Sequence, residues 1–308
     1  MLYLTTRNKT DSYTAHRVLH SQQPPGGGYF VPFHLPVFTE EELSALKELS
    51  FSDTVARILN LFFGGNISGW DIDFAVGRQA VKLVNMSHRI FVLESWHNHE
   101  GSHKYFVKRL HQIMRDPREN SGEPGAWFCT AVEIALLFAL YGCLLRRDIT
   151  RFNVALPAGD MQRLLSVRYA QQMGLPVYTV ALGAEESEDL WEFIYHGKYS
   201  TRREVLPTGL EQLIYLHFGM DGVKKYLLAV ENKRQYHLSE EELQRFADGL
   251  FTSVVGANRV QSVISSVKRS CNYNISPDAA CAYGALQDCR VRGAGGMDAV
   301  LLSFLKPE

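Results

Sequence analysis

The segment Trp96–Lys104 holds the side chains whose types and spacing could do chemistry. Within it, His99-Glu100-Gly101-Ser102-His103 matches H-E-x-x-H, a pattern in which two histidines bind zinc and the glutamate acts as a base. The segment also follows an apolar run and ends in Lys104, and a lysine amine becomes a nucleophile where burial lowers its pKa. The sequence therefore indicates either a metal-dependent hydrolase or a lysine that does covalent chemistry.

A zinc site would need His99 and His103 on one face of a helix, with Glu100 as the base. Gly101 and Ser102 are poor residues for the interior of a helix, so the zinc pattern is weak. A zinc hydrolase stays a remote alternative, and we predict no dedicated metal site. The further candidate ligands are Glu119, Glu123, His97 and His111.

The composition is that of a soluble globular protein. The 308 residues are 46% hydrophobic and 21% charged, which is enough to build a core. A net charge of −1 indicates no nucleic-acid partner, and the longest apolar run, Ala131–Leu145 around Glu133, predicts a buried helix and no membrane span. The N-terminal residues do not resemble a signal peptide, and five cysteines without a C-x-x-C pair indicate reduced thiols. We therefore expect a cytoplasmic protein.

Apolar segments of strand length alternate with helical ones, which is typical of an α/β fold with parallel strands. The predicted strands are 90–93, 152–156, 176–181 and 299–304. The predicted helices are one that starts near Thr39 with a capping box, then 51–63, 68–81, 105–114, 127–145, one that ends at Met173-Gly174, and 187–196. Residues 1–36 are predicted as strand and loop, 115–125 as a polar break, and the rest up to the last strand as mostly helical.

Short segments in a consistent order resemble the threonine synthases of bacteria and fungi. Gly27–Pro32 is similar to that family's G-G-L-Y-V-P turn, although Gly26 stands in place of its aspartate. Leu93–His97 with Lys104 is similar to L-E-L-F-H-G-P-T-x-x-F-K, and Pro157–Asp160 to the P-T-G-N start of a phosphate loop. The other similar segments are Tyr3–Arg7, Val55–Leu59, Gln172–Val177, Ser276–Ala280 and Ser303.

The resemblance implies the parallel-sheet fold type II of pyridoxal phosphate (PLP) enzymes, which is similar to the tryptophan synthase beta chain. It implies a small N-terminal subdomain over residues 1–88 and a reduced large domain over 89–308. It also implies a lyase of amino-acid biosynthesis that acts on O-phosphohomoserine or a related amino acid, with PLP as cofactor.

The resemblance assigns Lys104 to the Schiff base, Gly159, Asp160 and Arg163 to the cofactor phosphate, and Ser303 to the pyridine nitrogen. The phosphate loop is altered, because its second glycine is lost and Asp160 would repel a phosphate dianion. Arg163 and Arg168 would offset this repulsion if they turn inward. In the alternative interpretation, Asp160 is only the N-cap of the following helix.

The family carries a whole substrate domain where this chain has only a loop, so that domain is expected to be deleted. Ser121–Gly125 superficially resembles the family's substrate loop, and we predict a plain surface turn there. Loss of a wall of the site predicts impaired catalysis. The alternative is a noncatalytic relative that binds a small molecule, such as an amino acid, or a protein; a homo-oligomer could supply the missing wall. Only the enzyme requires Lys104 to be buried within reach of Gly159 and Ser303.

Overall fold

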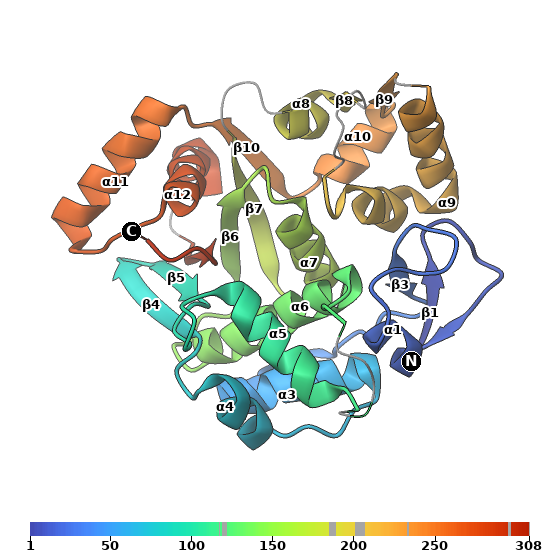
Figure 1. The fold of residues 1–308 in the computed structure, drawn as a ribbon. Helices are drawn as coiled ribbons and strands as arrows, with labels where there is room; N and C mark the ends of the chain where they lie inside the picture. Colours follow the sequence, from blue (N-terminus) through green and yellow to red (C-terminus); the bar gives the residue numbers. More distant parts are fainter. Residues whose placement is uncertain are drawn as a thin grey trace.

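The computed structural model describes all residues except 117, 119–121, 185–188, 201–206, 233, 295–296 and 308. A six-stranded sheet forms the centre of the molecule, in the order β10-β7-β6-β11-β5-β4 (Figure 1). Its strands are β4 (Lys82–Ser87), β5 (Ile90–Glu94), β6 (Phe152–Pro157), β7 (Val177–Ala184), β10 (Leu250–Val254) and β11 (Ala299–Ser303). Every neighbouring pair is parallel except β4 with β5, so the predicted α/β fold with a mostly parallel sheet is confirmed.

The central strands are apolar along their whole length because both faces of the sheet are covered. Every residue of β5 and β11 is buried. Alternate side chains of a strand point to opposite faces. Val92 and Leu301 accordingly pack with α11 (Ala257–Cys271) and α12 (Pro277–Cys289), whereas Leu93 and Leu302 belong to the larger core on the other face.

The larger core is built around α6 (Ala126–Leu145), which is apolar on nearly every side. It packs against α3 (Phe51–Phe63), α7 (Met161–Gln172), α5 (His103–Met114) and the 3-10 helix η1 (Ala45–Glu48) (Figure 1). In the described part of the chain, α6 is the one helix long and apolar enough to cross a membrane, yet 83% of its apolar window is buried inside the protein. Helix α6 is therefore the buried core helix that the sequence predicted.

Two smaller units flank the central layers. The N-terminal unit is an antiparallel sheet of β1 (Leu2–Thr5), β2 (Tyr13–Thr14) and β3 (Phe30–Pro32). Helix α1 (Ala15–Leu19) packs beside this sheet, whereas α2 (Glu40–Ser44) contacts η1 and α6, and α4 (Gly69–Val76) contacts α3 and α5. The other unit contains α8 (Asp189–His196), β8 (Lys198–Ser200), α9 (Leu210–Glu231), β9 (Gln235–His237) and α10 (Glu240–Ala247), and the π-turn η2 (Arg290–Ala294) precedes β11.

The local predictions are confirmed where capping side chains mark the ends of helices. Thr39 and Glu42 form the predicted capping box of α2. The predicted helix 68–81 is wrong at its end, because Gly77 takes a positive φ of 91° and stops α4 at Val76. Strand β4 follows instead, paired to β5. The boundary between 1–88 and 89–308 stays a prediction.

The prediction of mostly helical structure before the last strand is confirmed by α9, α10, α11 and α12, but it missed β8, β9 and β10. Strand β10 forms the edge of the central sheet beside β7. Its sequence, Leu-Phe-Thr-Ser-Val, is mixed because one side of an edge strand is open, and its residues are half-buried or exposed. The apolar run that identifies an inner strand is therefore missing.

Close packing of α12 on β7 predicts a large cost for a side chain at Gly183. A Cβ added there would lie 2.3 Å from the carbonyl oxygen of Cys281. We expect Gly183→Ala to lower the free energy of unfolding by about 2–3 kcal/mol in urea denaturation, because backbone must move to make room. Gly122→Ala, which meets nothing within 4 Å, is the control and should change stability little.

Candidate functional site

The parallel strands β5, β11 and β6 are neighbours, so their carboxyl ends lie at one edge of the sheet. Ligand sites of open α/β sheets lie outside this edge. The segments that follow the three strands are 95–102, 304–307 and 158–160. Gly159 and Asp160 lie in the last of these segments, and Ser303 ends β11. Lys104 and Arg163 lie in the first turns of the helices that follow β5 and β6, so the topology brings the predicted site residues toward the same edge.

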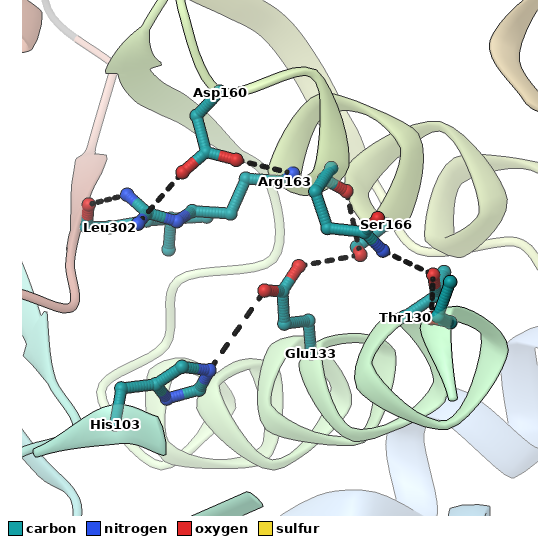
Figure 2. A network of polar contacts seen from close by, with 9 residues as sticks. His103, Thr130, Glu133, Asp160, Arg163, Ser166 and Leu302 are labelled. Carbon is teal, nitrogen blue, oxygen red and sulfur yellow. Dashed lines mark hydrogen bonds and ion pairs between the residues drawn. The ribbon is translucent and has the colours of Figure 1, made fainter. Parts of the chain in front are cut away.

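Asp160 begins α7 and is its N-cap. Its Oδ1 accepts a hydrogen bond of 2.9 Å from the backbone N–H of Arg163. Its Oδ2 also lies 2.8 Å from Nη2 of Arg163, so the carboxylate is ion-paired to the residue it caps (Figure 2). The N-cap interpretation is confirmed. A carboxylate of this chain thus occupies the helix terminus that otherwise attracts a bound anion.

Arg163 turns inward, as the phosphate interpretation required, whereas Arg168 does not. The Arg163 guanidinium donates to the carbonyl of Leu302 at 3.4 Å and lies 4.4 Å from the ring centre of Phe304. Arg168 instead donates to the backbone carbonyls of Phe246 and Asp248, at 2.9 and 2.6 Å. The cation that reaches the edge of the sheet is therefore Arg163, and its partner there is Asp160.

At the start of α5, His103 turns inward and Lys104 turns outward. The His103 ring stacks on Phe304, with centroids 4.1 Å apart, and only 16% of its side chain is exposed. Burial lowers the pKa of His103 to about 3, so the imidazole is neutral at physiological pH. Lys104 is exposed, which differs from the burial that a Schiff-base lysine requires. The helical period places Phe106 and Leu110 in the core instead.

Glu133 is the site residue that the sequence reasoning did not select. It lies on α6 with only 8% of the residue exposed, and its Oε2 accepts a hydrogen bond of 2.7 Å from the hydroxyl of Ser166. Burial raises its pKa to about 8, with the negative charge of Asp160 as the next cause. The signal was available, since one carboxylate inside a wholly apolar helix needs an explanation.

The carboxyl of Glu133 faces the imidazole of His103, as Figure 2 shows, with 3.9 Å between Oε1 and Nε2. That separation falls within the range of an ion pair. However, the shifted pKa values leave both groups uncharged at neutral pH, so we treat the contact as one between a protonated acid and a neutral imidazole. The distance also exceeds that of a hydrogen bond.

Ser303 is buried at the end of β11, and its hydroxyl donates a long hydrogen bond of 3.5 Å to the carbonyl of Leu305. The residue beside it in the sheet is Glu94, whose carboxylate accepts from the Tyr273 hydroxyl and lies 2.5 Å from Nε2 of His97. His97 therefore binds a neighbouring carboxylate. No described contact joins Ser303 to Lys104.

The predicted site residues divide between two clefts. A cleft of about 390 Å³ between α5 and α6, which we call the α5–α6 cleft, is lined by His103, Lys104, Val107, Lys108, Glu123, Pro124, Cys129 and Glu133. A cleft of about 410 Å³ at the start of α7 is lined by Pro157, Gly159, Asp160, Met161, Gln162, Pro207, Thr208 and Asp278. The structure thus brings Asp160 and Gly159 together and assigns Lys104 to the other cleft.

The helix that a zinc site on His99 and His103 would require does not form. Helix α5 begins at His103, and Gly101 takes a φ of 64°, so His99 and His103 do not share a helical face. Among the described residues, no group of three or more histidine, cysteine or acidic side chains is placed to hold a metal ion. Two predicted residues, Glu119 and Ser121, lie outside the described part of the chain.

The residues at this edge do not fit PLP in the manner that the resemblance implied. The phosphate position at the start of α7 is capped by a carboxylate, and the one inward arginine is paired to it. The lysine that would hold the cofactor is exposed, and the histidine before it occupies the buried position.

Comparisons with known proteins place the fold. Residues 2–78 match the family model for the threonine synthase N terminus. A search of curated protein sequences gives no match. The structure is similar to that of PLP-bound threonine synthase from Brucella melitensis, with a TM-score of 0.81 at 16% identity, over 100% of this chain and 89% of that one.

Two further threonine synthases share the arrangement. For the yeast structure the TM-score is 0.82 at 13% identity, over 99% of this chain and 87% of that chain. For the Escherichia coli structure it is 0.67 at 15% identity, over 100% and 89%. The resemblance to threonine synthases and the fold type II architecture are therefore confirmed, and at these identities the solved structures show the fold alone.

The raised pKa of Glu133 predicts a stability that falls as pH rises. The unfolded chain releases this proton above the ordinary pKa of 4.5, whereas the folded chain holds it up to about 8. The folded state therefore loses about 3 kcal/mol relative to the unfolded state between pH 5 and pH 8. We expect Glu133→Gln to remove this loss, so that in urea denaturation its advantage over the wild type grows with pH.

The matched control is Glu123→Gln, which changes a carboxylate of the same cleft whose side chain is 54% exposed. Its stability should follow the wild-type pH dependence. The titration of His103 contributes equally to both proteins and cancels in the difference. A difference between Glu133→Gln and wild type that stays constant from pH 5 to pH 8 would show that Glu133 is charged when folded.

Proposed function

We propose that this chain is a noncatalytic threonine synthase-like protein, which binds a small molecule at the inherited edge of the sheet without attaching PLP. The observation that carries the proposal is the Asp160 carboxylate at the start of α7, ion-paired to Arg163. A cofactor phosphate would have to displace this carboxylate and would meet its negative charge. In this proposal the fold is kept, but the carboxylate of Asp160 occupies the position where the cofactor phosphate would bind.

The exposure of Lys104 supports the same proposal. A lysine attacks an aldehyde only after it loses its proton, and burial is what lowers the pKa enough for this. The side chain of Lys104 lies in solvent contact on the first turn of α5. This amine therefore lacks the burial that would activate it as a nucleophile.

A PLP-dependent lyase acting on O-phosphohomoserine or a related amino acid is the second candidate. It is favoured by the PLP-bound structure among the similar folds and by the fact that Lys104 still lines a cleft. Cytoplasmic location, where the five free cysteines would stay reduced, is part of either proposal.

PLP titration of the purified protein distinguishes the two. We expect no cofactor absorbance band that depends on Lys104, and no cofactor mass on Lys104 after borohydride reduction and peptide mass spectrometry, because the amine is exposed and not held in a pocket. Lys108→Ala, one turn further along α5, is the matched control for Lys104→Ala. A band lost in Lys104→Ala and kept in Lys108→Ala would establish the lyase candidate instead.

Asp160→Asn tests the observation that carries the proposal. Asparagine keeps the helix cap but removes the charge and releases Arg163. We expect noncovalent affinity for PLP to rise about tenfold in equilibrium dialysis, because one like-charge contact is removed. An unchanged affinity would mean that Asp160 is not what excludes the phosphate.

A further inference from the structure

We propose that the α5–α6 cleft binds a small monocarboxylate with an apolar body, with Lys104 as the partner of the carboxylate and Glu133 as the group that decides whether an anion is tolerated. The proposal deepens the noncatalytic binding function above and rests on it. It gives a role to Lys104 and Glu133 that requires no cofactor.

The charges that line the cleft leave one cation uncompensated. Nζ of Lys108 lies 3.4 Å from Oε1 of Glu123, so these two charges balance. Burial keeps His103 neutral, and Glu133 is protonated at neutral pH. Among the described residues, no ion pair includes Lys104. A single exposed ammonium at the mouth of an otherwise neutral cleft selects a monoanion.

The remaining surface of the cleft is apolar. Val107 and Pro124 contribute hydrocarbon, and burial raises the pKa of the Cys129 thiol to about 12, so it too is uncharged. The volume of about 390 Å³ lies at the small end of the range typical of ligand sites. An anionic head on a small apolar body fits this combination better than a phosphate, which presents no apolar surface.

Glu133 lines the cleft, and only one of its two carboxyl oxygens makes a hydrogen bond. Its Oε2 accepts from Ser166, whereas its Oε1 has no hydrogen-bond partner among the described residues and lies beyond hydrogen-bond distance of His103 (Figure 2). While it is protonated, Glu133 adds no charge to the cleft. Once it ionises, it places a negative charge in the wall, and that charge repels a bound carboxylate.

Glu133 is the group facing this part of the cleft that titrates near neutral pH. From α7 it is faced by the ion pair of Asp160 and Arg163, whose charges act on its pKa in opposite directions, and by the hydroxyl of Ser166. From α5 it is faced by His103, which is neutral. From its own helix it is faced by Cys129, one turn earlier, which is also neutral.

Benzoate is the probe that tests the cleft, with benzylamine as the cation of similar size and benzamide as the neutral analogue. By isothermal titration calorimetry at pH 6.5, we expect benzoate to bind and both analogues to bind at least tenfold more weakly. Between pH 6.5 and pH 9, affinity for benzoate should fall about tenfold in the wild type, because Glu133 ionises. In Glu133→Gln the affinity should stay level over the same range.

Lys104→Ala should lower benzoate affinity about tenfold, whereas Lys47→Ala, an exposed lysine on η1 remote from the cleft, should leave it unchanged. Equal binding of benzoate and benzylamine, a pH dependence that persists in Glu133→Gln, or absence of benzoate binding would each overturn the proposal. These outcomes are separate from attachment of PLP to Lys104, which would overturn the noncatalytic function itself.

Discussion

The near-complete burial of α6 is the constraint on which the rest of the structure depends. A helix without a polar stripe must be enclosed on every side. The enclosure is made by α3 and η1 on one side and by α7 and the central sheet on the other. Glu133 lies within that helix, so the packing that stabilises the core also removes water from a carboxyl group. The chemistry at the edge of the sheet follows from this burial.

Burial keeps most of the ionisable side chains around Glu133 uncharged, although their arrangement resembles a network of ion pairs. Glu133 and His103 face each other without charge, and the remaining ion pair, Asp160 with Arg163, closes the start of α7. Phe304 contacts both His103 and Arg163, which links the end of β11 to α5 and α7. The carboxyl edge of the central sheet is therefore built from contacts within the chain.

The fold was predictable where local patterns are strong. The capping box at Thr39, the amphipathic α3 and the apolar runs of β5, β6 and β11 were all recognised from the chain alone. Strand β10 was missed because an edge strand lacks a continuous apolar run. Strand β4, at the other edge of the sheet, was missed for the same reason, since most of its residues are half-buried or exposed.

The sequence by itself determined the α/β class, the inner strands of the central sheet and the resemblance to threonine synthases, because apolar periodicity and short motifs are local properties. Only the tertiary structure decided that Lys104 is exposed while His103 is largely buried, since one step along a helix turns the side-chain direction by about 100°. It also decided the protonation of Glu133, whose pKa depends on burial and on Asp160, a residue far along the chain. Protonation depends on the surroundings in space, which a sequence pattern does not contain.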